Sequence, residues 1–171
     1  MDAQPKTLKL ATPTEREIVI TRDFDAPRDL VFECFTKPEL LKRWLGVHNG
    51  WVLAVCEIDL RVGGAYRYLW RGPGKTEMGM GGKYLEIVRP ERLVSTEKFD
   101  AAWYPGGAVG TLTLAERSGR TLATTSLLYE SKEARDAVLK SPMDQGMEAG
   151  YAALDALLAA LGSDAGGRKA G

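Results

Sequence analysis

The residues of this chain that could take part in chemistry are few and scattered. The single histidine, His48, lies in a Gly-Val-His-Asn-Gly stretch that is typical of a loop. One imidazole cannot build a multi-histidine metal site, and any imidazole-based general base must be this residue. Cys34 and Cys56 show no CxxC spacing and have apolar neighbours, so we expect two buried, reduced thiols. The sequence therefore predicts no metal site and no cofactor.

Two glycine-containing motifs resemble nucleotide-binding loops but fail on spacing. Gly74-Lys75-Thr76 lacks the glycine five residues before Gly74, where Leu69 stands, and a strand rather than a helix follows. Gly79-Met80-Gly81 would need a third glycine at the position of Tyr84. We expect Gly79, Gly81 and Gly82 to mark a bulge or bend that curves a sheet.

Four carboxylates are candidates for general acid–base chemistry, and two of them could form a pair. Glu57 and Asp59 share one strand face, which we interpret as solvated, with Asp59 or Arg61 paired near the following turn. Glu86 and Glu97 lie on strands whose inward faces the sequence does not assign. If either side chain points inward, it places a titratable group inside the protein, and this leaves an enzyme open as a hypothesis.

The composition limits the class of protein. Of the 171 residues, 23 are basic and 23 acidic, so the formal net charge is zero. This balance argues against a nucleic-acid partner and against a polybasic membrane-surface protein. The N-terminus lacks the apolar core of a signal peptide, and no apolar run approaches the length of a membrane span. We therefore expect a cytoplasmic protein without membrane insertion.

Hydrophobic periodicity indicates the elements that position these residues. The predicted strands cover residues 15–24, 51–60, 66–71, 78–88, 93–99, 109–116 and 121–129. Two short helices are expected between the first two strands, another over 132–140 with Ser131 as its cap, and a long helix from 143 that ends before Gly162. Consecutive strands with short turns should pair antiparallel, and only the long helix can cover the resulting sheet.

The predicted fold class is therefore α+β: a curved antiparallel sheet of about six or seven strands wrapped around a long C-terminal helix, with two short helices after the first strand. Residues 1–14 are expected to form a flexible N-terminal arm, 15–161 one folded domain, and 162–171 a flexible C-terminal tail.

Several segments resemble a known family. The stretch 17–27 and Leu41-Lys42-Arg43-Trp44 resemble the START-like (SRPBCC) superfamily with the helix-grip fold. Segments 59–64, 82–87 and 90–94 are similar to the family named after the C-terminal domain of the activator of the heat-shock-protein-90 ATPase. The resemblance covers residues 15–161. It implies a helix-grip fold and, for single-domain members, a carrier or sensor with a hydrophobic cavity between the sheet and the long helix.

We therefore expect a non-catalytic protein, monomeric or homodimeric, that binds a small hydrophobic, lipid-like ligand in such a cavity. The expected cavity walls are Trp44, Tyr66, Tyr68, Trp70, Met143, Met147, Tyr151 and Leu154, with Trp44 and Met143 near an opening and with tyrosine hydroxyls as polar contacts. Solid core packing of the same residues stays open. So do a protein-interaction or co-chaperone-like module that uses the outer sheet face, and a cyclase- or hydratase-type enzyme.

Overall fold

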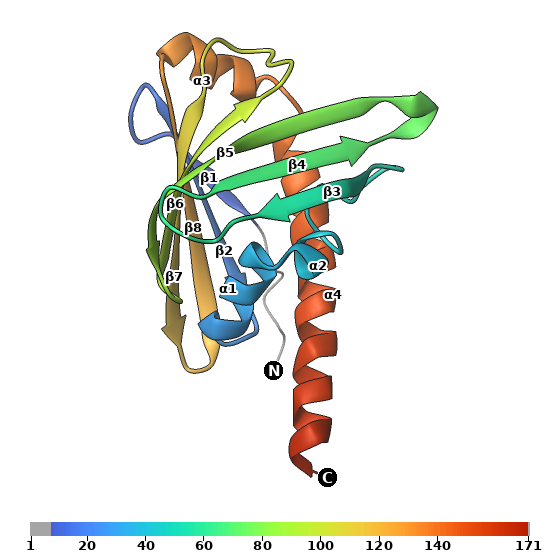
Figure 1. The fold of residues 1–171 in the computed structure, drawn as a ribbon. Helices are drawn as coiled ribbons and strands as arrows, with labels where there is room; N and C mark the ends of the chain where they lie inside the picture. The colour runs from blue at the N-terminus through green and yellow to red at the C-terminus, as the bar shows by residue number, and fades with distance from the viewer. Residues whose placement is uncertain (1–7, 171) are drawn as a thin grey trace.

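One antiparallel sheet and a long C-terminal helix dominate the computed structural model of the protein, as Figure 1 shows. The structure describes residues 8–170, and the side chains of residues 8–163. The strands are β1 (Lys9–Ala11), β2 (Glu17–Phe24), β3 (Val52–Ile58), β4 (Ala65–Arg71), β5 (Glu77–Val88), β6 (Arg92–Phe99), β7 (Ala108–Arg117) and β8 (Arg120–Tyr129), in the spatial order β1-β2-β8-β7-β6-β5-β4-β3. The helices are α1 (Arg28–Thr36), α2 (Pro38–Leu41), α3 (Lys132–Leu139) and α4 (Met143–Ala170), with a single 3₁₀ turn, η1 (Pro73–Lys75).

The α+β helix-grip architecture is confirmed, but the sheet has eight strands rather than six or seven. The additional strand is β1, which pairs with β2 from Lys9 opposite Thr21 to Ala11 opposite Val19. It is short and exposed, so it leaves no period-two pattern in the sequence. It lies in the segment expected as an N-terminal arm, of which residues 1–7 lie outside the described residues.

The long helix begins as predicted but does not end before Gly162, because α4 continues to Ala170. A glycine inside a helix costs only about 1 kcal/mol relative to alanine, which is not enough to terminate it here. Most of the segment expected as a C-terminal tail is therefore helical, and Gly171 lies outside the described residues. The predicted cap of α3 is confirmed, since the Ser131 hydroxyl accepts a hydrogen bond of 3.0 Å from the Ala134 amide.

The glycines of β5 lie where the sheet changes direction. In Figure 1, β3, β4 and β5 run at a steep angle to β6, β7 and β8 and cross over α4. A Cβ atom on Gly82 would lie 1.9 Å from the Thr96 carbonyl oxygen on β6, so only glycine permits this close approach. A register shift between Tyr84 and Glu86 adds a bulge to the same strand. The predicted bend is confirmed, and it brings β3, β4 and β5 across the long helix α4.

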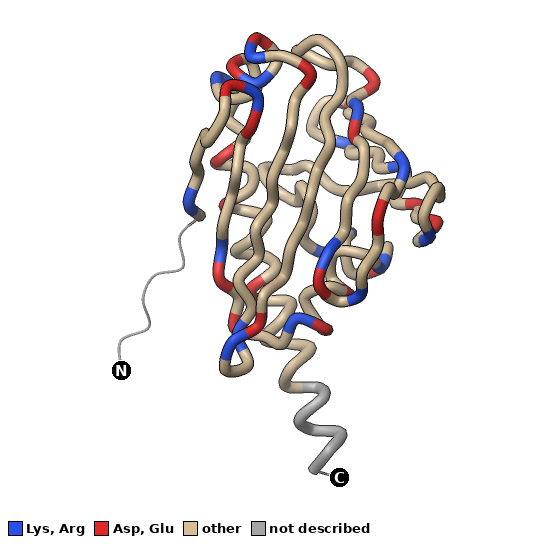
Figure 2. The backbone as a smooth tube through the Cα atoms, turned by 90° about the vertical axis from the view of Figure 1, so that its left-hand side faces the viewer, with Lys and Arg blue, Asp and Glu red and all other residues tan. Residues whose placement is uncertain are grey.

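The sheet has two faces of different character. Ile20, Leu112 and Leu93 share one cross-strand row and are buried toward α4. Figure 2 shows that the opposite face of β2, β8, β7 and β6 carries its charged residues mainly near the strand ends. The core therefore lies between the sheet and the helices, with α1 and α2 closing one end (Figure 1).

Candidate functional site

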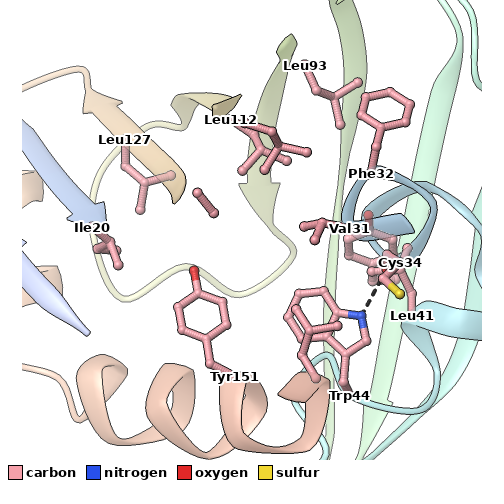
Figure 3. Close-up of a cluster of buried hydrophobic side chains, with 14 of the residues drawn as sticks. Ile20, Val31, Phe32, Cys34, Leu41, Trp44, Leu93, Leu112, Leu127 and Tyr151 are labelled. Atoms are coloured by element: carbon pink, nitrogen blue, oxygen red, sulfur yellow. Dashed lines mark hydrogen bonds between the residues drawn. The ribbon is translucent and has the colours of Figure 1, made fainter. Parts of the chain in front are cut away.

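A pocket of about 580 Å³ lies between the inner face of the sheet and the first turns of α4. Strands β4 to β8 supply one side of it, and α4 with the segment after α2 supplies the other. In Figure 3, Tyr151 points from α4 toward the sheet, while Leu112 and Leu127 point toward the helix from the strands. Most of the lining side chains are aromatic or aliphatic.

Seven of the eight residues predicted as cavity walls line this pocket: Trp44, Tyr66, Tyr68, Trp70, Met143, Met147 and Tyr151. Tyr66, Tyr68 and Trp70 alternate along β4 with exposed fractions of 6%, 8% and 6%, as the period of two predicts. Leu154 does not line the pocket. It lies about one turn further along α4, fully buried in the core.

The rim of the pocket differs from the prediction. Trp44 was expected near an opening but is only 2% exposed, and its Nε1 donates a hydrogen bond of 2.9 Å to the Cys34 carbonyl oxygen (Figure 3). The most exposed aromatic residue in the lining is Trp103, at 47%, in the loop between β6 and β7. This loop therefore forms part of the mouth.

Several polar atoms of the wall are already used within the protein. Trp70 Nε1 donates to the Leu45 carbonyl oxygen over 3.0 Å, and the Tyr66 hydroxyl donates to the Thr96 carbonyl oxygen over 2.6 Å. The side-chain hydroxyls of Tyr68 and Tyr84 share a hydrogen bond. The hydroxyls of β4 that we expected to serve as polar contacts for a ligand are thus engaged in holding the wall.

Among the described residues that line the pocket, Glu97 is the one with a carboxylate. It lies on β6 in the same inward-facing series as Leu93, Ser95 and Phe99, all of which line the pocket. Burial raises the pKa of Glu97 from its ordinary value of 4.5 to about 7, since transfer from water disfavours the charged form. Glu97 therefore supplies the titratable interior group that the enzyme hypothesis requires.

Glu86, the other candidate for that role, lies elsewhere. Its side chain is 48% exposed, and it forms an ion pair of 3.1 Å with Arg92 Nε. The β5 bulge between Tyr84 and Glu86 explains the difference, because it turns Glu86 outward although Tyr84 faces the pocket.

Tyr104 and Tyr129 lie near Glu97 and were missed at the sequence level. Burial first, and the Glu97 carboxylate second, raise the pKa of Tyr104 to about 12 and that of Tyr129 above its ordinary range. Tyr104 is 4% exposed, and its hydroxyl has no hydrogen-bond partner among the described residues. The loop that carries it is held by Glu130, whose carboxylate accepts a hydrogen bond of 3.2 Å from the Gly107 amide.

The remaining candidates for chemistry are the two thiols, His48 and Asp59. Burial raises the pKa of both the Cys34 and the Cys56 thiols to about 11, which makes them poor nucleophiles and confirms the prediction of buried free thiols. His48 lies at the pocket edge, with Nε2 2.8 Å from Asn49 Nδ2. Asp59 pairs with Arg61 Nε over 2.7 Å, as predicted.

Neither a metal centre nor a membrane span is found in the described part of the chain. Nowhere within residues 8–170 do three or more His, Cys, Asp or Glu side chains gather as metal ligands would. None of the helices there combines the length and the apolar character needed to cross a bilayer.

Comparisons with known proteins agree with this architecture. A protein from Rhodobacter sphaeroides is 31% identical, with a TM-score of 0.85 over 90% of this chain and 99% of its own. Protein Ms6760 from Mycobacterium smegmatis is 25% identical, with a TM-score of 0.78 over 90% of this chain and 97% of its own. An HSP90 activator from Plasmodium falciparum, 21% identical, shares the fold with a TM-score of 0.51 over 66% of this chain and 72% of its own.

No curated protein matches the chain. The family model described as "Activator of Hsp90 ATPase homolog 1-like protein" matches residues 25–159. These residues run from the turn before α1 into α4 and include all the pocket-lining side chains discussed above. The chain therefore belongs to the activator of Hsp90 ATPase homolog 1-like family, within the START-like superfamily.

Proposed function

We propose that this protein binds a small, largely apolar molecule in the pocket between the sheet and α4, as a carrier or sensor. The observation that carries the proposal is the pocket itself: about 580 Å³ of space walled by aromatic and aliphatic side chains. Pockets of roughly 300–1,000 Å³ with apolar walls and few polar groups are typical of small-molecule sites. Solid packing of a core leaves no space of that size.

Gly110 on β7 offers a way to fill the pocket without disturbing its walls. It lines the pocket, and a Cβ atom built on it would lie 3.5 Å from Leu127 Cδ2 and 3.7 Å from Glu97 Oε2, which are ordinary contact distances. Gly110→Leu should therefore place a side chain into the space beside Glu97. The matched control is Thr113→Leu, on the outer face of the same strand.

The experiment is a titration of each variant with the neutral fluorophore 1-pyrenemethanol, followed by fluorescence. Wild type and Thr113→Leu should bind pyrenemethanol saturably at one site, and Gly110→Leu should bind it at least tenfold more weakly. Equal affinity in all three proteins, or no saturable binding in the wild type, would refute the proposal. Far-ultraviolet circular dichroism checks that each variant is folded.

A protein-interaction or co-chaperone-like role is the second candidate, favoured by the outer face of the sheet. Strand register places Thr21, Thr124 and Thr113 in one row there, and Figure 2 shows few charges across the middle of this face. A broad uncharged surface suits contact with another protein. Thr124→Lys should then abolish stimulation of a purified heat-shock-protein-90 ATPase, if the wild type stimulates it. A cyclase- or hydratase-type activity stays a prediction, for which Glu97 is the candidate residue.

A further inference from the structure

Two polar groups of the pocket have no ion-pair or hydrogen-bond partner among the described residues. Among the described residues, no side chain forms an ion pair with the Glu97 carboxylate, and burial is the cause that moves its pKa to about 7. The Tyr104 hydroxyl is buried and makes no hydrogen bond within that same part of the chain. Leaving a polar group without a partner in such a site costs free energy, so each group favours a ligand that pairs with it.

The charge of the lining selects the kind of ligand. No lysine or arginine is among the described residues that line the pocket, whereas Glu97 places a carboxylate there. An anionic ligand would therefore meet a carboxylate with no lysine or arginine in the described lining to compensate its charge. A cationic group would instead form a pair with Glu97, and a buried charge that is paired avoids most of the desolvation penalty of an isolated one.

The aromatic rings beside Glu97 suit a cation as well. The Tyr104 ring packs edge-on against Tyr129, with centroids 5.5 Å apart, and against Trp103 at 5.2 Å. Phe99 adds a ring at 6.3 Å from Tyr104. The faces of such rings attract ammonium groups, and the attraction grows as the group is removed from water.

We propose that the pocket selects apolar molecules that carry one protonated amino group, bound between the Glu97 carboxylate and the Tyr104 hydroxyl oxygen. The proposal rests on the proposed ligand-binding function and specifies its ligand class. A primary ammonium has three N–H donors. One donates to a Glu97 oxygen and a second to Tyr104 Oη, while the apolar remainder of the ligand lies against the walls formed by β4 and α4.

The test uses three fluorescent probes with the same ring system and different head groups: 1-pyrenemethylamine, 1-pyrenemethanol and 1-pyrenecarboxylate. At pH 8 we expect the wild type to bind the amine at least tenfold more tightly than the alcohol, and the carboxylate most weakly. Glu97→Gln should reduce the preference for the amine over the alcohol to less than threefold. Tyr104→Phe should reduce it partially. Glu86→Gln, which removes an exposed carboxylate of the outer surface, should keep the wild-type preference.

The outcomes separate this proposal from the one on which it rests. If the alcohol binds at the Gly110→Leu-sensitive site and the amine binds no better, the amine proposal is wrong and the ligand-binding function stands. If the carboxylate binds most tightly, the amine proposal is likewise wrong. If no probe binds saturably, both proposals fail. An amine preference that persists in Glu97→Gln would also overturn the inference, because the cation would then be bound elsewhere.

Discussion

The Arg22 guanidinium on β2 forms two hydrogen bonds with the Asp155 carboxylate on α4, with Nη1–Oδ1 and Nη2–Oδ2 distances of 2.8 Å and 2.6 Å. The same guanidinium lies 4.9 Å from the centroid of Phe24 and 5.9 Å from that of Tyr151. The Arg22 side chain is 6% exposed and that of Asp155 is 25% exposed, so the guanidinium is largely removed from water while the carboxylate keeps part of its exposure. It joins the helix to the sheet about one turn beyond Tyr151, where the pocket ends. The pair thus fixes the helix at the closed end of the pocket.

Removing Asp155 should destabilise the protein strongly, because the Arg22 charge would remain buried without its partner. We expect Asp155→Ala to lower the free energy of unfolding by about 3 kcal/mol. Urea denaturation measures this change. Asp59→Ala, which breaks the exposed pair with Arg61, is the matched control and should leave the urea midpoint unchanged. Similar shifts of the urea midpoint in both variants would show that the Arg22–Asp155 pair contributes no more than an exposed ion pair.

Much of the fold could be predicted because its signals are local. The alternation of Tyr66, Tyr68 and Trp70 identified the wall on β4, and the spacing of Met143, Met147 and Tyr151 identified the helix face. Short strand β1 escaped prediction, because it depends on backbone pairing with β2 rather than on side-chain pattern.

The polar part of the site could be predicted only in part. Glu97 could have been assigned to the interior, since it alternates in phase with the apolar residues Leu93 and Phe99. Glu86 could not have been assigned in this way. The bulge in β5 interrupts the alternation of inward and outward side chains, and the residue types between Tyr84 and Glu86 do not indicate a bulge. Tyr104 lies in a loop, and its burial depends on contacts with Phe99 and Tyr129 that are set by the tertiary fold.

A second prediction concerns the buried hydroxyl that joins β8 to the segment before α1. Thr121 is fully buried, and its Oγ1 donates a hydrogen bond of 2.6 Å to the Ala26 carbonyl oxygen. Thr121→Val keeps the shape but leaves that carbonyl oxygen unsatisfied, so the free energy of unfolding should fall by about 1.5 kcal/mol. Thermal and urea denaturation report the loss. Thr124→Val, on the outer face of the same strand, should change neither midpoint, and an equal effect there would contradict the assignment.

A third prediction concerns Gly46, which allows Trp70 to approach the segment after α2. Gly46 has φ of +70°, and a Cβ atom on it would lie 2.2 Å from Trp70 Nε1. Gly46→Ala should therefore displace the indole, break its hydrogen bond to Leu45 and cost about 2 kcal/mol in stability. The tryptophan emission maximum should shift at the same time. Gly63 has a similar φ of +84°, and no atom of the described residues lies within 4 Å of a Cβ built on it, so Gly63→Ala measures the backbone strain alone. An equal cost in both variants would mean that the contact with Trp70 is unimportant.

The last prediction follows from the raised pKa of Glu97. A carboxyl whose pKa is higher in the folded than in the unfolded state stabilises the fold while it is protonated, and this contribution is lost as pH rises through the folded value. The pKa of Glu97 rises from 4.5 to about 7 on folding. Between pH 4.5 and pH 8 the free energy of unfolding of the wild type should therefore fall by about 3 kcal/mol more than that of Glu97→Gln. Urea denaturation at several pH values gives both curves. Glu86→Gln keeps Glu97 and should follow the wild-type curve. Parallel curves for wild type and Glu97→Gln would show that the Glu97 carboxylate is solvated, and the pocket would then lack the uncompensated charge on which amine selection depends.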